Sequence, residues 1–122
     1  MQTFKHVNIS KLKEVTAGSF DLLTSLVEMF KNQAPKFHDQ LQEHLNNHEF
    51  TLLAKLAHKI KGSLSTLAIT ELATKMKTLE RVAKTNNIEN NAQELINEYK
   101  QVSQEAIVEL DEIHEIFKNS MI

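Results

Sequence analysis

One short segment of the chain combines residue types that can carry a phosphoryl group. The segment AHKIKGSLSTL, residues 57–67, contains a histidine, two lysines and one of the two glycines in the sequence. A neutral imidazole is a competent nucleophile toward phosphorus near neutral pH. A lysine three positions further along a helix lies on the same face and can neutralise negative charge beside that imidazole. His58 and Lys61 are therefore candidates for a nucleophile and its electrostatic partner.

The apolar residues around this segment predict the direction in which His58 points. They recur at helical spacing and form a core stripe of Leu53, Ala57, Ile60, Leu64 and Leu67. At about 100° per residue, His58 lies roughly 140° from the direction of this stripe, so we expect its side chain to face solvent. We expect a docking surface around it, made of small and basic residues: Ala54, Lys55, Lys59, Gly62 and Ser65.

Gly62 is the unusual residue in this predicted helix. Glycine costs about 1 kcal/mol relative to alanine in a helix interior. A position without a side chain, however, lets the backbone of a partner come close. We interpret Gly62 as clearance for a docking protein. The alternative is a solvated histidine beside solvated lysines.

The composition excludes several classes of protein and site. No cysteine occurs, which rules out disulfides and thiolate metal sites and favours a cytoplasmic location. Two glycines cannot form a glycine-rich nucleotide loop, so a kinase with its own ATP site is excluded. The formal net charge of −2 gives no reason to expect nucleic-acid binding. No apolar run reaches the roughly 18 residues of a membrane span.

We expect no bound metal and no cofactor. His44 and His48 are four residues apart, but no carboxylate completes a convincing metal site around them. Met29 and Met76 fall on apolar stripes, which favours packing in the core over ligation.

The whole chain, residues 1–122, is predicted to be one all-α domain. Apolar residues at helical spacing predict a short helix after Asn8, a second from about residue 20 to 46, a third over 49–67, a fourth over 69–84 and a fifth over 89–118. Asn8 and Ser19 are the predicted N-caps of the first two helices. Pro35 predicts either a kink in the second helix or two separate helices. Short connections between long helices favour an antiparallel four-helix bundle with an additional N-terminal helix. We expect a monomer.

The residues around His58 resemble the signature of histidine-containing phosphotransfer (HPt) domains. That signature is His-x-φ-Lys-Gly-(Ser/Ala) on a helix, preceded by Ala and followed by Leu-Gly. The matching residues here are Ala57-His58-Lys59-Ile60-Lys61-Gly62-Ser63 and then Leu67-Ala68, with Met29-Phe30 and Ala34-Pro35 upstream and Leu79-Glu80 downstream. Ala68 departs from the family pattern, because many members have glycine there.

The resemblance implies a phosphoryl carrier without kinase activity of its own. His58 would accept the phosphoryl group, Lys61 would neutralise it and Lys59 would assist docking. The implied partners are response-regulator receiver domains, which would supply Mg²⁺ and the acceptor aspartate, and a hybrid sensor histidine kinase. The alternative function is a helical adaptor that docks receiver or other signalling domains without phosphotransfer.

The spacing of the third and fourth helices adds Glu80 to the candidate site. His58 lies 11 residues before Ile69 and Glu80 lies 11 after it, so an antiparallel hairpin brings them to the same height. Glu80 can then accept a hydrogen bond from the imidazole and set its tautomer. The alternative is a surface ion pair between Glu80 and Lys84.

Overall fold

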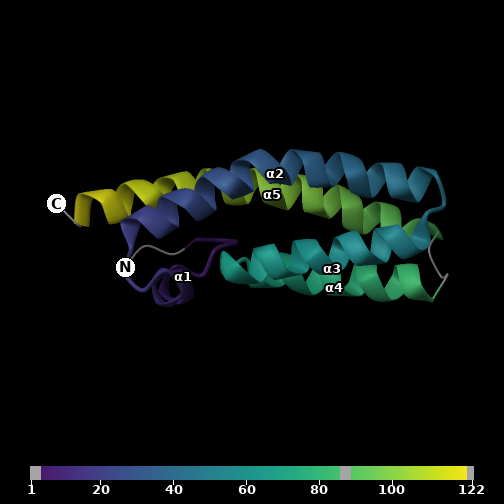
Figure 1. Cartoon of the computed structure of the whole chain (residues 1–122), viewed down its shortest axis with the longest axis horizontal. Helices are drawn as coiled ribbons and strands as arrows, with labels where there is room; N and C mark the ends of the chain where they lie inside the picture. Colours follow the sequence, from purple (N-terminus) through teal and green to yellow (C-terminus); the bar gives the residue numbers. More distant parts are fainter. Residues whose placement is uncertain (1–3, 86–88, 121–122) are drawn as a thin grey trace.

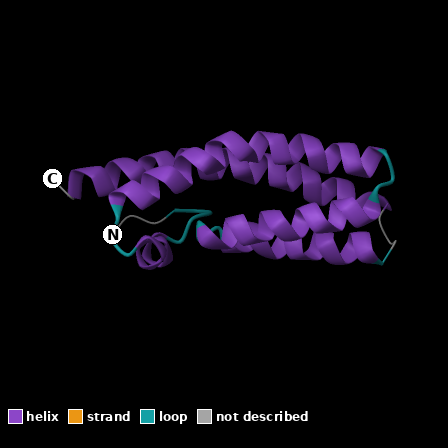
Figure 2. Ribbon diagram, in the orientation of Figure 1, coloured by secondary structure: helices purple, strands orange, loops and turns teal. Residues whose placement is uncertain are grey.

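The computed structural model describes residues 4–85 and 89–120 of the chain. Helices account for nearly all of these residues (Figure 2). In chain order they are α1 (Ile9–Thr16), α2 (Phe20–Asn46), α3 (Phe50–Thr66), α4 (Thr70–Lys84) and α5 (Glu89–Ser120). The predicted all-α bundle with a short additional N-terminal helix is confirmed.

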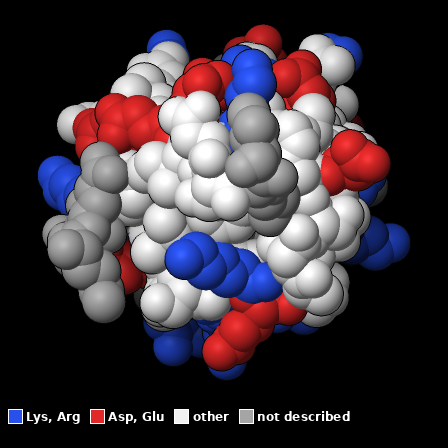
Figure 3. Space-filling model, turned by 90° about the vertical axis from the view of Figure 1, so that its left-hand side faces the viewer, with Lys and Arg blue, Asp and Glu red and all other residues white. Residues whose placement is uncertain are grey.

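The four long helices run alternately in opposite directions, and they differ in length. The helix α2 has 27 residues and α5 has 32, whereas α3 has 17 and α4 has 15. The α3–α4 hairpin therefore covers only one end of the α2–α5 pair, and α1 lies near the other end (Figure 1). Viewed from that other end, uncharged side chains occupy most of the centre and charged ones lie mainly around the rim (Figure 3).

Side chains that cap the helices mark where α1 and α2 begin. Asn8 accepts a hydrogen bond from the Lys11 N–H, and Ser19 accepts one from the Leu22 N–H, each at 3.1 Å. These bonds satisfy backbone donors that the first turn of a helix leaves free. Both caps agree with the sequence-based prediction.

Pro35 does not divide α2, so the alternative of two separate helices is wrong. The residue removes one backbone donor, but α2 continues through it from Phe20 to Asn46. Buried side chains on both sides of the proline hold the two halves against the same core. The buried hydroxyl of Tyr99 on α5 also donates to the Ala34 carbonyl at 3.2 Å. Packing therefore outweighs the loss of one helical hydrogen bond.

The turn between α3 and α4 contains Ala68, at the position where glycine is common in HPt domains. Ala68 has φ +60°, a left-handed conformation that favours glycine. The residue is fully buried, and its carbonyl accepts the Asn8 N–H at 3.0 Å. The N-terminal segment therefore supports this strained turn, ten residues from His58.

The N-terminal segment is also bound to α5 by two carboxylates. Glu109 accepts the backbone N–H groups of His6 and Val7, at 2.9 and 3.1 Å. The imidazole of His6 contacts Glu105 through Nε2 at 2.8 Å, and this hydrogen bond lowers the pKa of the Glu105 carboxyl. These contacts join residues about a hundred positions apart, and sequence spacing gave no sign of them.

Candidate functional site

His58 lies on the outer face of α3, with its side chain 64% exposed. Its neighbours Ala57 and Ile60 are buried beneath it, as the apolar stripe predicts. The predicted direction of His58 toward solvent is thus confirmed. An imidazole in this position is accessible to another protein.

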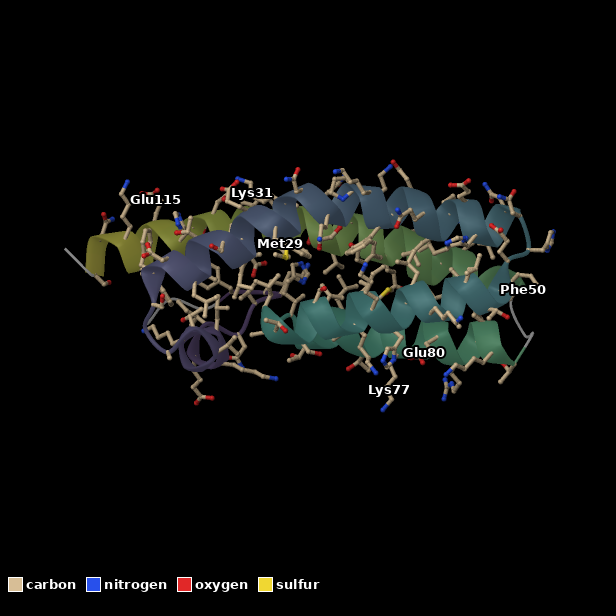
Figure 4. The ribbon with its side chains drawn as sticks, in the orientation of Figure 1. Met29, Lys31, Phe50, Lys77, Glu80 and Glu115 are labelled. Carbon is tan, nitrogen blue, oxygen red and sulfur yellow. The ribbon has the colours of Figure 1, made fainter. Side chains whose placement is uncertain are left out.

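Glu80 reaches His58 from α4. One carboxylate oxygen, Oε1, lies 3.1 Å from Nδ1 of His58. The Glu80 side chain is only 15% exposed, and it lies on the same edge of the α3–α4 hairpin as Lys77 (Figure 4). The antiparallel hairpin therefore brings the two residues to the same height, as their equal spacing from Ile69 predicts.

Lys84 holds the other oxygen of the same carboxylate. Its ammonium donates to Oε2 of Glu80 at 2.9 Å, so the two alternatives predicted for Glu80 occur together. The Lys84 hydrogen bond, with a smaller contribution from His58, holds the pKa of the Glu80 carboxyl below its usual range. An ionised carboxylate can only accept hydrogen bonds, so Nδ1 of neutral His58 carries the proton. The lone pair is then on Nε2, the ring nitrogen that Glu80 does not contact.

Space beside His58 is kept clear by Gly62. A Cβ atom added at Gly62 would meet no other atom within 4 Å. The fold itself therefore does not require glycine here, because an alanine would fit. Without a side chain, this exposed position leaves the surface beside His58 open.

The predicted docking residues are not all on the surface. Lys55, Lys59, Gly62 and Ser65 are exposed. Ala54 is 3% exposed and belongs to the core, so its prediction as a docking residue is wrong. Ala54 precedes His58 by one helical turn, but a single methyl group is too short to extend beyond the packed side chains around it.

An apolar hollow that the sequence did not predict lies between α2 and α3. Met29, which we expected in the core, is 54% exposed (Figure 4). Its side chain lines an apolar hollow of about 150 Å³ together with Phe30, Ile60 and Leu64 among others. Apolar residues cover a wider face of α2 than the face that is buried. Because α3 is short, it does not cover the edge of α2 that carries Met29. Lys59 also turns toward α2, with its ammonium 5.6 Å from the centre of the Phe37 ring.

The fold and the site together define a helical bundle that presents one histidine, held by a carboxylate, on an open face. The sequence model of the Hpt domain family matches residues 25–116, which contain all of α3 and α4 and most of α2 and α5. The chain therefore belongs to the Hpt domain family, whose members are phosphoryl carriers in two-component signalling and interact with receiver and kinase domains. No curated protein and no solved structure matches the chain.

Two further findings concern membranes and metals. Within residues 4–85 and 89–120, no helix is both long and apolar enough to cross a membrane. Among the described side chains, no three His, Cys, Asp or Glu residues gather in a way that could hold a metal ion.

Proposed function

We propose that this protein relays phosphoryl groups between the aspartates of receiver domains through a phosphohistidine at His58. The observation that carries the proposal is the exposed imidazole whose Nδ1 is held by Glu80, within the motif typical of the family. In the forward step, the lone pair of Nε2 attacks the phosphorus of an aspartyl phosphate. The N–P bond forms as the P–O bond to the aspartate breaks, and the aspartate leaves as a carboxylate. The reverse step returns the phosphoryl group to another aspartate.

Glu80 and Lys61 stabilise different charges in this step. Attack by Nε2 while Nδ1 keeps its proton makes the ring cationic, and the Glu80 carboxylate stabilises that charge. The Lys61 ammonium, one turn from His58 on the same face, neutralises the oxygens of the phosphoryl group. The receiver domain would supply Mg²⁺ and the acceptor aspartate. The protein thus contributes a nucleophile and a docking surface.

The docking surface extends from α3 to α2. It includes the exposed residues Lys55, Lys59, Gly62 and Ser65 around His58. The exposed Met29 and the apolar hollow beside it add a contact area on α2. Apolar contact surrounded by lysines suits a partner that buries a hydrophobic patch within an acidic surface.

Incubation with a phosphorylated receiver domain and Mg²⁺ tests the phosphoryl transfer. We expect an acid-labile, alkali-stable label on the wild type and none on His58→Gln. His48→Gln is the matched control, because His48 is exposed in the connection between α2 and α3, and it should keep the label. Label on His58→Gln would refute the site. No label with any receiver that binds would favour the adaptor function.

The role of Glu80 can be tested independently of transfer. We expect Glu80→Ala to release the proton from Nδ1 of His58, which nitrogen chemical shifts of the ring report, and to slow transfer about tenfold. Glu80→Gln should restore part of the proton occupancy at Nδ1 and part of the transfer rate, because its amide oxygen can still accept the hydrogen bond. Glu71→Ala changes an exposed carboxylate on the same helix and serves as the control. An unaltered tautomer and rate in Glu80→Ala would leave Glu80 as a surface partner of Lys84.

A further inference from the structure

The α3–α4 hairpin is the basic part of the molecule. Residues 50–85 contain seven basic and two acidic residues, whereas residues 91–120 contain two basic and seven acidic ones. The formal net charge is therefore +5 for residues 50–85 and −5 for residues 91–120 of α5. A partner with an acidic surface is attracted to the hairpin and repelled by α5.

A polar hollow lies in the groove between α3 and α4 on this basic side. It has a volume of about 290 Å³ and is lined by Lys61, Ser65, Thr70, Ala73, Thr74 and Lys77. Lys61 comes from α3 and Lys77 from α4, so a cation is contributed by each helix. Small side chains form the rest of the lining and leave the hollow shallow and open.

The two lysines of the hollow differ from Lys75 and Lys84 on α4, which form ion pairs. Lys75 pairs with Glu98, and Lys84 pairs with Glu80. Within residues 4–85 and 91–120, neither Lys61 nor Lys77 has an acidic side chain within ion-pair distance. The hollow therefore holds two positive charges that the described part of the chain does not neutralise.

The hollow is continuous with the His58 face, because Lys61 belongs to both. Lys61 lies one turn after His58 on α3 and lines the hollow toward α4. A protein that covers His58 therefore reaches the hollow without any change in the bundle. A receiver domain that binds Mg²⁺ beside its acceptor aspartate must carry carboxylates near that surface. The negative charge of these carboxylates is complementary to the positive charge of the two lysines in the hollow.

We propose that this hollow anchors a carboxylate side chain of the receiver domain, so that the partner's footprint crosses α3 and extends onto α4. The identity of the partner rests on the proposed function, whereas the anchoring of a protein carboxylate rests on the hollow itself. Because the lysines are near the surface, the contact acts mainly on association rate and salt dependence.

Charge reversal at Lys77 tests the anchor with the receiver. We expect Lys77→Glu to weaken the affinity for the receiver about three- to tenfold at low salt, and the difference to shrink at high salt. Lys11→Glu makes the same charge change at an exposed position on α1, outside the proposed docking surface, and should have a much smaller effect. Equal effects of the two variants would overturn the anchor, even where His58 is labelled normally.

A probe that does not depend on the receiver separates this proposal from the proposed function. Titration of the protein with hexaglutamate should shift the amide NMR signals of Lys61, Ser65, Thr74 and Lys77. Lys77→Glu should abolish the shifts of Lys61, Ser65 and Thr74. These shifts without any label on His58 would support the anchor and refute the phosphoryl relay. Shifts centred on another surface, or equal shifts with inorganic phosphate at the same concentration, would overturn the anchor of a protein carboxylate.

Discussion

The α2–α5 pair and the α3–α4 hairpin belong to one bundle but differ in what their polar side chains do. Between α2 and α5, Gln42 and Gln93 each donate to the other, at 2.9 and 2.7 Å, and Lys31 pairs with Asp111 at 3.1 Å. These groups join one helix to the other. On the hairpin, the polar groups at His58 and in the α3–α4 hollow face outward.

The difference teaches that the outward-facing polar groups lie on the hairpin, whereas both pairs of helices contribute to one core. Both pairs bury apolar side chains in this core, and the polar groups between α2 and α5 add cross-links. The hairpin is short and rich in buried alanines, including Ala54, Ala57, Ala73 and Ala83. Small side chains let neighbouring helices pack closely. Close packing lets Glu80 on α4 reach His58 on α3. We therefore expect changes in the two regions to have separable effects.

The largest expected effect is on stability, from a core change in the α2–α5 pair. Leu41 on α2 is fully buried, so Leu41→Ala should lower the free energy of unfolding by about 2–5 kcal/mol. Urea denaturation measures this loss. Below the unfolding temperature, the transfer rate per folded molecule should stay unchanged. A parallel fall in that rate would contradict the separation of the two regions.

The second-largest expected effect is on the rate of phosphoryl transfer, from a substitution on the hairpin. Lys61→Ala should slow phosphoryl transfer about tenfold, because one positive charge near the phosphoryl oxygens is lost. The free energy of unfolding should stay within about 0.5 kcal/mol of the wild type. Transfer kinetics and urea denaturation are measured on the same sample, with Lys11→Ala on α1 as the control. An unchanged transfer rate would refute the electrostatic role of Lys61.

A smaller effect in the opposite direction is expected at Gly62. Gly62→Ala should raise the free energy of unfolding by about 0.5–1 kcal/mol, because the added methyl meets no other atom within 4 Å and alanine favours the helix. The same methyl should weaken receiver binding, since it takes up the clearance beside His58. Urea denaturation and a binding titration test both effects. A more stable variant with unchanged receiver affinity would show that docking does not use this clearance.

The smallest expected effect is the pH dependence that Glu80 contributes to stability. Lys84 and His58 hold the pKa of the Glu80 carboxyl below its usual range in the folded protein. The stabilisation from this carboxylate is therefore complete above the ordinary glutamate pKa of about 4.3 and is lost as pH falls through the lower folded value. Its size should stay below about 1 kcal/mol, because Lys84 is largely exposed.

Glu80→Gln isolates this pH-dependent contribution. The difference in unfolding free energy between His58→Gln and the double variant His58→Gln/Glu80→Gln, in which the carboxylate has no ionisable ring beside it, should be constant from pH 6 to 8 and should decrease under acid conditions. A difference that grows as pH falls would have the wrong sign for a carboxylate with a lowered pKa.

Much of the fold and part of the site follow from local patterns along the chain. Helical spacing of apolar residues predicts each helix of the bundle, and the caps at Asn8 and Ser19 predict where two of them begin. The hairpin geometry also predicts the contact between His58 and Glu80, because equal distances from a turn set equal heights. These features depend on backbone geometry alone, which the sequence spacing encodes directly.

By itself, the sequence determined the helices and the outward direction of His58, and it placed Glu80 at the height of His58 with the Lys84 ion pair as the alternative. The tertiary structure alone decided which surface positions are covered. Ala54 is buried although it lies one turn before His58, and Met29 is exposed although it lies on an apolar stripe. The support of Ala68 by Asn8 and the pairing of His6 with Glu105 likewise join distant segments. Whether a side chain is buried depends on how far each neighbouring helix extends and how closely it packs. Those lengths and distances are set only when the whole bundle assembles.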